Sequence, residues 1–133
     1  MTRHLFAYGT LKPGLAPAEA APLVARLTLV GEGSVAGRLY LLGSYPGAVL
    51  ESGCGTRIHG VVYELPEDDA NLRNIDTYEE FYPAEPAASL FARVQQLVQT
   101  EGKGEIMCWI YVYNRPVGRA PLIEDGVFRE SIL

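Results

Sequence analysis

The sequence predicts an α+β domain built mainly from strands. Short runs rich in β-branched and aromatic residues recur along the 133-residue chain, separated by glycine and proline. Only one or two segments have the residue spacing of an amphipathic helix, and these do not alternate with the strands. A chain of this length has the size of one domain. We therefore expect residues 1–133 to form a single domain of about six or seven strands and one or two helices.

Composition narrows the classes of partner. Charged residues make up 20% of the chain and hydrophobic residues 48%, as in soluble globular proteins. The net charge of −5 and the lack of any Lys/Arg cluster predict no nucleic-acid partner. No apolar stretch approaches the roughly 20 residues of a membrane span. The first strand begins almost at Met1, which leaves no room for a signal peptide. We expect a cytoplasmic protein with no membrane partner.

Histidine and cysteine each occur only twice, and their spacing is not that of metal ligands. No metal and no other cofactor is expected. Cys108 alternates within a strand-like run and is predicted to be a core residue. Cys54 lies between two glycines in a predicted loop, where it could act as a nucleophile only beside a base such as His4 or His59.

The first strand, residues 4–8, runs directly into a loop that contains Gly9 and the pair Pro13-Gly14. Without a Cβ at Gly9, a ligand can approach the backbone closely, and successive amides can converge on a carboxylate or an oxyanion. The same pattern also fits an ordinary strand end followed by a turn.

The elements up to residue 65 are expected in the following order. Residues 16–26 are alanine-rich and favour a short helix, which starts or breaks at Pro22 because proline removes a helical hydrogen bond. Residues 27–42 are punctuated by glycine and predict two strands with a tight connection. A turn at Tyr45-Pro46-Gly47 precedes two further strands at residues 48–51 and 57–65.

A second helix is predicted to enter at Pro66, among acidic residues that favour a helix N-terminus, and to end near Tyr78. Its apolar face consists of residues at helical spacing, namely Ala70, Leu72, Ile75 and Tyr78. Residues 90–98 and 105–113 then read as two strands joined by a glycine-containing hairpin connection.

Two of these segments carry family signatures. Tyr8-Gly9-Thr10-Leu11 follows the first strand, and Ile75-Asp76-Thr77-Tyr78-Glu79 ends the second helix. Weaker matches occur collinearly at residues 37–40, 45–49, 59–65 and 109–113. Together these motifs resemble the gamma-glutamylcyclotransferase-like superfamily, in particular its AIG2-like members and the gamma-glutamylamine cyclotransferases. The resemblance implies a small mixed β-barrel with helices packed outside it, so that the sheet closes on itself.

The resemblance also implies a reaction and its residues. A small gamma-glutamyl compound folds so that its α-amino group attacks its own γ-carbonyl, which gives 5-oxoproline and releases an amine or amino acid. Glu79 is the implied general acid/base, and Tyr8, Gly9, Thr10 and Leu11 form the implied substrate-binding loop. Its amides would hold either the substrate carboxylate or the oxyanion. No cofactor is implied.

Glu79 also stands out by its position. It follows the predicted helix end and lies among aromatic residues, and both the helix dipole and desolvation would raise its pKa. Alternatively, Glu79 is an ordinary solvated acidic residue at a helix end. Glu80 occupies the place where the family commonly has glycine, so the catalytic assignment lies between Glu79 and Glu80, and the register favours Glu79.

Other departures leave alternatives open. Residues 83–89 form a Pro- and Ala-rich insertion that we expect to reshape the pocket rim. Tyr113 matches a position near the family's pocket, but an aromatic residue in a strand is more often a core residue, and Tyr113 is not assigned to the site. The chain is thus a cyclotransferase, a non-catalytic small-molecule binding protein, or an interaction domain without a ligand. The leaving amine and the oligomeric state have no signature in the sequence.

Overall fold

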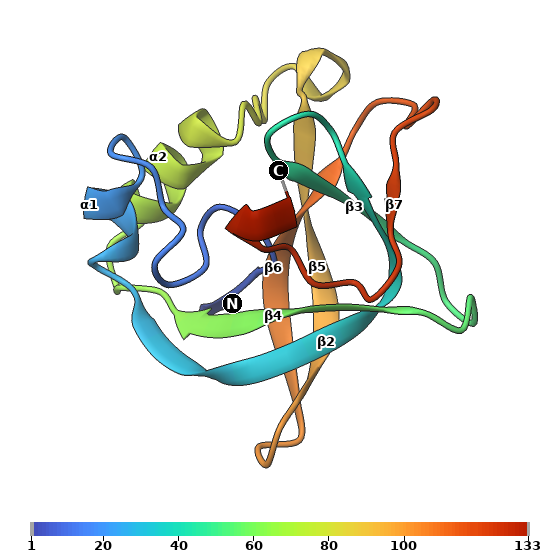
Figure 1. Ribbon diagram of the computed structural model, residues 1–133. Coiled ribbons are helices and arrows are strands. Elements are labelled where there is room, and N and C mark those ends of the chain that lie inside the picture. The colour runs from blue at the N-terminus through green and yellow to red at the C-terminus, as the bar shows by residue number, and fades with distance from the viewer. Residues whose placement is uncertain (1, 133) are drawn as a thin grey trace.

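The computed structural model describes residues 2–132 and contains a closed five-stranded mixed barrel (Figure 1). The barrel order is β2–β4–β1–β6–β5, and β5 closes it by pairing with β2 at Gly33 and Ser34. Strands β1 and β6 run parallel, and the other neighbours are antiparallel. Two further strands, β3 and β7, pair with β2 outside this ring. The strands are β1 (His4–Ala7), β2 (Thr28–Leu41), β3 (Pro46–Leu50), β4 (Arg57–Glu64), β5 (Phe91–Thr100), β6 (Glu105–Tyr113) and β7 (Leu122–Ile123). The α+β barrel expected from the sequence is therefore confirmed.

Strand β2 corrects the prediction of two strands over residues 27–42. It is one continuous strand of 14 residues with a bulge between Leu29 and Gly31. Gly33 and Gly37 mark close approaches of neighbouring strands rather than a turn. A Cβ added to Gly33 would lie 2.7 Å from Cγ1 of Val98, where β5 crosses β2 to close the barrel. Because the strand is long, it pairs with β4 and β5 and then with β3 and β7.

The predicted turn at Tyr45-Pro46-Gly47 is wrong in part, because β3 already begins at Pro46. Pro46 pairs with Leu41 of β2. Proline is tolerated there because β3 is an edge strand, with a hydrogen-bonded neighbour on one side only. The turn itself is closed by Leu42, whose amide donates to the carbonyl of Tyr45.

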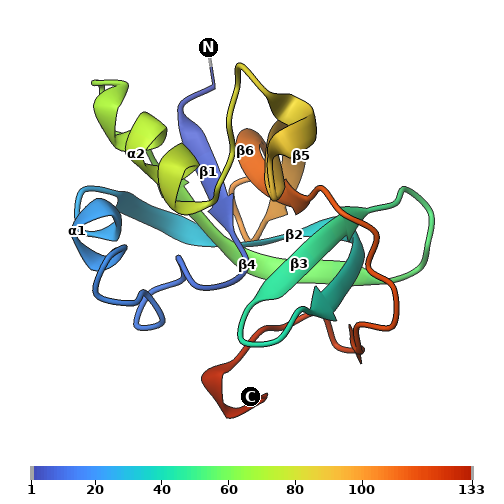
Figure 2. The same ribbon diagram turned by 90° about the horizontal axis from the view of Figure 1, so that it is seen from above.

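The helices lie together on one flank of the barrel, away from β3 and β7 (Figure 1, Figure 2). Helix α1 (Ala21–Val24) is much shorter than the predicted 16–26, because Pro22 fits only its first turn. Helix α2 (Ala70–Tyr78) begins after the predicted entrance at Pro66 and ends as expected at Tyr78. Two 3₁₀ turns, η1 (Pro86–Ala88) and η2 (Glu130–Ile132), complete the described elements. No helix within residues 2–132 has the length and apolar character needed to cross a bilayer.

Two hydrophobic clusters meet at β1, since side chains alternate along a strand. Phe6 and Tyr8 belong to the cluster inside the barrel, whereas Leu5 and Ala7 belong to the cluster beneath the helices, with Ile75 of α2. Cys108 is buried in the barrel cluster, as predicted. The end of β1 is therefore fixed from both sides, and it is there that the chain leaves the sheet for the Gly9 loop.

Candidate active site

The Gly9 loop and the end of α2 border one cavity of about 400 Å³. All five residues singled out by the sequence, Tyr8, Gly9, Thr10, Leu11 and Glu79, line it. The cavity lies between the loop after β1, the C-terminal end of α2, the start of β3 and the C-terminal segment. The remaining lining residues are Phe6, Ala7, Leu15, Pro17, Glu19, Ser44, Tyr45, Pro46, Tyr78, Glu80, Leu90, Phe91, Tyr111, Phe128 and Glu130.

The loop presents backbone to this cavity. Gly9 is packed so closely against β3 that an added Cβ would lie 2.7 Å from Cγ of Pro46. The carbonyl of Gly9 accepts a hydrogen bond of 3.0 Å from the amide of Lys12, which closes the turn. Within residues 2–132, the amides of Gly9, Thr10 and Leu11 donate no backbone hydrogen bond. Adjacent free amides of this kind can bind an anion.

The Thr10 hydroxyl ties the loop to the helix. Its Oγ1 lies 2.9 Å from the hydroxyl oxygen of Tyr78, and either group can donate. Because Glu79 directly follows Tyr78, this bond fixes the distance between the loop and the glutamate. Thr10 thus has a positioning contact that the sequence did not reveal.

The Tyr8 hydroxyl is engaged within the protein. It donates to the carbonyl of Tyr111 over 2.5 Å and accepts from the amide of Ala48 over 3.2 Å. Burial, together with the nearby charge of Glu79, raises the pKa of Tyr8 well above its ordinary value. These two bonds join β1 to β6 and β3, so the hydroxyl braces the cavity wall as well as bordering the cavity.

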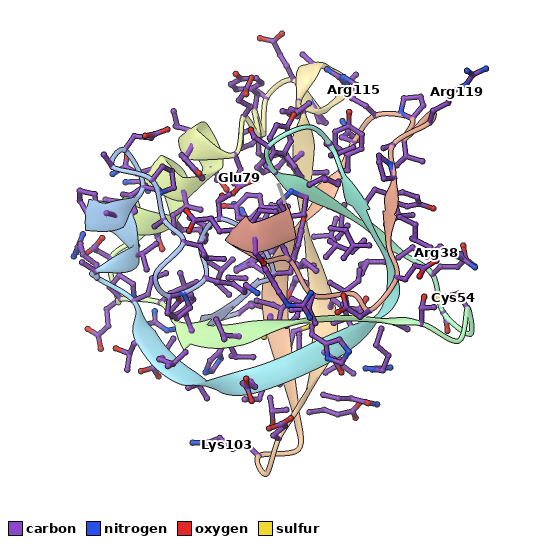
Figure 3. The ribbon with its side chains drawn as sticks, in the orientation of Figure 1. Arg38, Cys54, Glu79, Lys103, Arg115 and Arg119 are labelled. Carbon is purple, nitrogen blue, oxygen red and sulfur yellow. The ribbon has the colours of Figure 1, made fainter. Side chains whose placement is uncertain are left out.

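Glu79 is the C-cap residue of α2, and its amide donates to the carbonyl of Ile75 over 2.9 Å. Burial raises the pKa of its carboxyl group to about 7, and the like charge of Glu80 adds to the rise. The direction agrees with the expectation, and desolvation, one of the two causes expected from the sequence, is the larger cause, followed by the charge of Glu80. No cation or hydrogen-bond donor within residues 2–132 offsets these effects. Figure 3 shows Glu79 close to the end of α2.

Glu80 differs from Glu79 in both backbone and exposure. Its φ of 55° lies in the left-handed region that favours glycine, and its side chain is exposed. This conformation turns the chain away from the helix axis, so the two neighbouring carboxylates are in different environments. Glu79 has the desolvated environment expected of a general acid/base, and Glu80 stands at the cavity rim.

A buried network anchors the end of α2, and sequence reasoning did not identify it. The Arg93 guanidinium donates twice to the Asp76 carboxylate, over 2.7 Å and 3.2 Å, and the Tyr111 hydroxyl donates to the same carboxylate over 2.6 Å. The guanidinium carbon also lies 4.2 Å from the centroid of the Trp109 ring. Asp76 thus connects α2 to β5 and β6, three residues before Glu79. The available signal was an acidic residue beside Ile75 on the buried face of the helix, with an arginine in the following strand.

The other sequence candidates lie outside the cavity lining. Residues 83–89 do not line it, so their expected effect on the rim is wrong; Asn114 and Arg115 hold this segment through its backbone carbonyls. Tyr113 packs edge-on against Phe91, with ring centroids 5.7 Å apart. Cys54 lies at the periphery, remote from Glu79 (Figure 3). Residues 2–132 contain no group of three or more potential metal ligands.

Comparison with known proteins gives one consistent result. The family model described as "Gamma-glutamyl cyclotransferase, AIG2-like" matches residues 5–130. The gamma-glutamylcyclotransferase family protein ytfP of Citrobacter rodentium is 37% identical over 124 residues, which cover 92% of each chain. Its namesake in Escherichia coli (strain K12) is 36% identical over 92% of this chain and 93% of its own.

Solved structures give the same picture. The solution structure of ytfP from Escherichia coli has a TM-score of 0.64 and 32% identity, and the match covers 98% of this chain and 99% of that one. The crystal structure of an AIG2-like protein from Mus musculus has a TM-score of 0.73 over 96% of this chain and 88% of that one. At 22% identity, the mouse protein supports the fold alone.

Proposed function

Because the chain belongs to the gamma-glutamyl cyclotransferase, AIG2-like family, we propose that it is a cyclotransferase acting on a small gamma-glutamyl compound. The products are 5-oxoproline and an amine or amino acid. The observation that carries the proposal is the half-buried Glu79 carboxylate, whose pKa is raised to about 7 in a cavity that also presents the free amides of the Gly9 loop. We place the reaction in the cytoplasm, as the sequence predicts.

The reaction begins with a proton transfer. Glu79 accepts a proton from the α-ammonium group of the substrate, which is a weaker acid than the Glu79 carboxyl group. A carboxylate with a pKa of about 7 is well matched to this donor, whereas an ordinary carboxylate is a much weaker base. The freed α-amine then attacks the γ-carbonyl carbon of the same molecule and forms a C–N bond.

The second half of the reaction returns the proton. The tetrahedral intermediate collapses as the bond between the γ-carbon and the amide nitrogen breaks, and the Glu79 carboxyl group protonates the departing nitrogen. The Glu79 carboxylate then takes up the second proton of the attacking nitrogen, which becomes the single N–H of 5-oxoproline, and this proton leaves with the released amine as its ammonium form. Both nucleophile and leaving group belong to the substrate, so neither water nor a cofactor enters the balance. The enzyme supplies the folded conformation, in which the attacking amine has a high effective concentration.

The Gly9 loop stabilises the negative charge of the bound substrate. The amides of Gly9, Thr10 and Leu11 are free to donate to the α-carboxylate or to the oxygen of the tetrahedral intermediate. No lysine, arginine or histidine lines the cavity, so these amides are the main source of positive potential for an anionic group. The cavity volume of about 400 Å³ suits a small-molecule ligand.

The other candidate function is a binding protein of the same fold without catalysis. Glu80, in a backbone conformation that favours glycine, is the feature that would accompany lost activity. Glu79 nevertheless keeps the desolvated environment that a general base requires. We therefore favour the enzyme.

Release of 5-oxoproline from a panel of gamma-glutamyl amines and dipeptides tests the proposal. Wild type is compared with Glu79→Gln and Glu80→Gln, both of which keep the side-chain shape. We expect product from wild type and Glu80→Gln and a loss of at least about a hundredfold in Glu79→Gln, as is typical of removing a general acid/base. Measurable binding without product from any compound would support the binding protein.

A further inference from the structure

The charge of the cavity lining is entirely negative. Four glutamates line it, Glu19, Glu79, Glu80 and Glu130, whereas none of the 11 lysines and arginines of the chain and neither histidine does so. These glutamates come from three separate segments of the chain. Glu79 is half-buried at the end of α2, and the other three are exposed at the rim.

The three rim glutamates lack neutralising partners. The four ion pairs within residues 2–132 involve none of them. Arg38, Lys103, Arg115 and Arg119 project from the periphery of the molecule, away from Glu79 (Figure 3). Lys12, which follows the loop, donates instead to the carbonyl of Phe128 over 2.7 Å. The rim glutamates therefore form no ion pair, and the charged side chains that line the cavity are all acidic.

This acidic lining discriminates between leaving groups. The gamma-glutamyl part of any substrate carries one ammonium and one carboxylate and is neutral overall. A leaving amino acid adds a carboxylate and makes the substrate anionic, whereas a leaving diamine adds an ammonium and makes it cationic. The net charge of the substrate is thus set by the leaving group.

We propose that the site prefers gamma-glutamyl amides whose leaving amine carries a second, distal ammonium group, and that Glu19 and Glu130 determine this preference. The inference rests on the proposed function. With the glutamyl part held between the Gly9 loop and Glu79, the leaving group extends to the rim formed by these two side chains. Glu19 lines the same cavity as Tyr78 and Thr10, whose hydroxyl groups are hydrogen-bonded to each other.

The test uses three substrates that differ only in the end of the leaving group: the gamma-glutamyl amides of diaminobutane, butylamine and aminobutyric acid. We expect kcat/KM to fall in the order cationic, neutral, anionic, by about three- to tenfold per step at low salt, as for a few exposed charge pairs. Added salt will compress the differences because it screens exposed charges.

Variants identify the source of the preference. The double variant Glu19→Gln/Glu130→Gln is expected to reduce the cationic-to-neutral ratio to near unity while retaining turnover of the neutral amide. The control, Glu64→Gln/Glu105→Gln, changes the net charge equally at exposed residues that do not line the cavity and should keep the wild-type ratio.

Two failures are distinguishable. Product from all three amides at equal kcat/KM, or a preference that survives the rim double variant, overturns this inference and leaves the cyclotransferase intact. Absence of 5-oxoproline from all three overturns the proposed function. In that case the dissociation constants of the same three amides decide the inference. Tightest binding of the cationic amide and weakest binding of the anionic amide in wild type, with this order lost in the rim double variant, supports it. Equal affinities for the three amides contradict it.

Discussion

The environment of Glu79 disfavours its charged form and also makes its carboxyl group suitable for proton transfer. A carboxylate buried without a cation or donor disfavours its charged form, which is why its pKa rises to about 7. The same rise brings it into the range where a carboxyl group exchanges protons with an amine at neutral pH. Two measurements, one of rate and one of stability, examine this single property.

The first prediction concerns the pH dependence of kcat/KM. Because Glu79 must be ionised to accept the proton, the rate should rise through an acid limb centred near pH 7. Glu80→Gln removes the like charge that opposes ionisation, so its limb should move to lower pH. Glu64→Gln, at an exposed site outside the cavity, should leave the limb unmoved. If the acid limb of the Glu80→Gln profile does not shift, the charge of Glu80 does not raise the pKa of Glu79.

The second prediction concerns folding stability. The pKa of Glu79 is raised in the folded state from an ordinary value of 4.5 to about 7, so the folded state binds the proton more tightly than the unfolded state. Its favourable contribution is fully present below about pH 4.5 and is lost as the pH rises through about 7. Relative to Glu79→Gln, wild type should thus lose up to about 3 kcal/mol of unfolding free energy across this window. Urea denaturation at several pH values measures it, and a pH-independent difference would contradict a raised pKa.

The third prediction concerns Gly9. In Gly9→Ala the new Cβ would lie 2.7 Å from Cγ of Pro46, so the loop or β3 must shift. We expect a destabilisation of about 1–3 kcal/mol, as for overpacking, and a larger proportional loss of kcat/KM because the free amides are displaced. In the control Gly31→Ala the new Cβ meets nothing within 4 Å. Equal activity in the two variants would argue against a role for the loop geometry.

At the scale of elements, the position of Glu79 depends on how α2 is fixed to the barrel. Asp76 receives the Arg93 and Tyr111 donors from β5 and β6, and the carbonyl of Tyr111 in turn accepts from Tyr8, directly after β1. Thr10 meets Tyr78 across the cavity. The helix end and the loop are therefore held by the same few hydrogen bonds, and Asp76 positions Glu79 rather than acting on the substrate.

The fourth prediction tests this anchor. Arg93→Leu leaves the buried Asp76 carboxylate without its ion pair and should destabilise the protein by about 3–5 kcal/mol. Arg26→Leu breaks the exposed pair between Arg26 and Asp68 and should cost no more than about 1 kcal/mol. Midpoints of urea unfolding compare the two. Similar losses in both variants would show that the Asp76 pair contributes nothing beyond a surface ion pair.

The elements most readily predicted were those whose signal is local. The apolar run before Gly9 and the helical spacing up to Tyr78 each predicted an element, and residues 105–113 form β6 as predicted. The glycines of β2 were interpreted as a turn, because the sequence does not show that β5 crosses at Gly33. Pro46 was assigned to a turn because its edge position depends on the whole sheet.

The residues of the candidate site also fall into two groups, those that a local sequence motif predicts and those that only the fold brings together. Glu79 and the Gly9 loop lie in short collinear motifs and were identified from the sequence. The partners of Asp76 could not be, because Arg93 and Tyr111 lie 17 and 35 residues further along the chain and reach it only through strand pairing. The rim glutamates Glu19 and Glu130 belong to segments without any motif, and only the folded chain brings them together.

At the scale of the whole molecule, the barrel places a strand end opposite a helix end. Strand β1 is held between β4 and β6, so the loop after Ala7 leaves the sheet from a fixed point. Helix α2 packs outside the same strand and is followed by its C-cap residue Glu79, and the C-terminal segment with Phe128 and Glu130 borders the cavity from another side. The cavity therefore forms where three parts of the chain converge, which accords with a match to the family that extends over residues 5–130.

The most direct measurement of the central claim is product analysis in water enriched in oxygen-18. Intramolecular attack predicts 5-oxoproline and an equal amount of free amine, with no solvent oxygen in the 5-oxoproline. Glu79→Gln and an enzyme-free sample, which record spontaneous cyclisation, should give only background. Glutamate carrying oxygen-18 would instead show that water attacks the γ-carbonyl, and the protein would then be a hydrolase rather than a cyclotransferase.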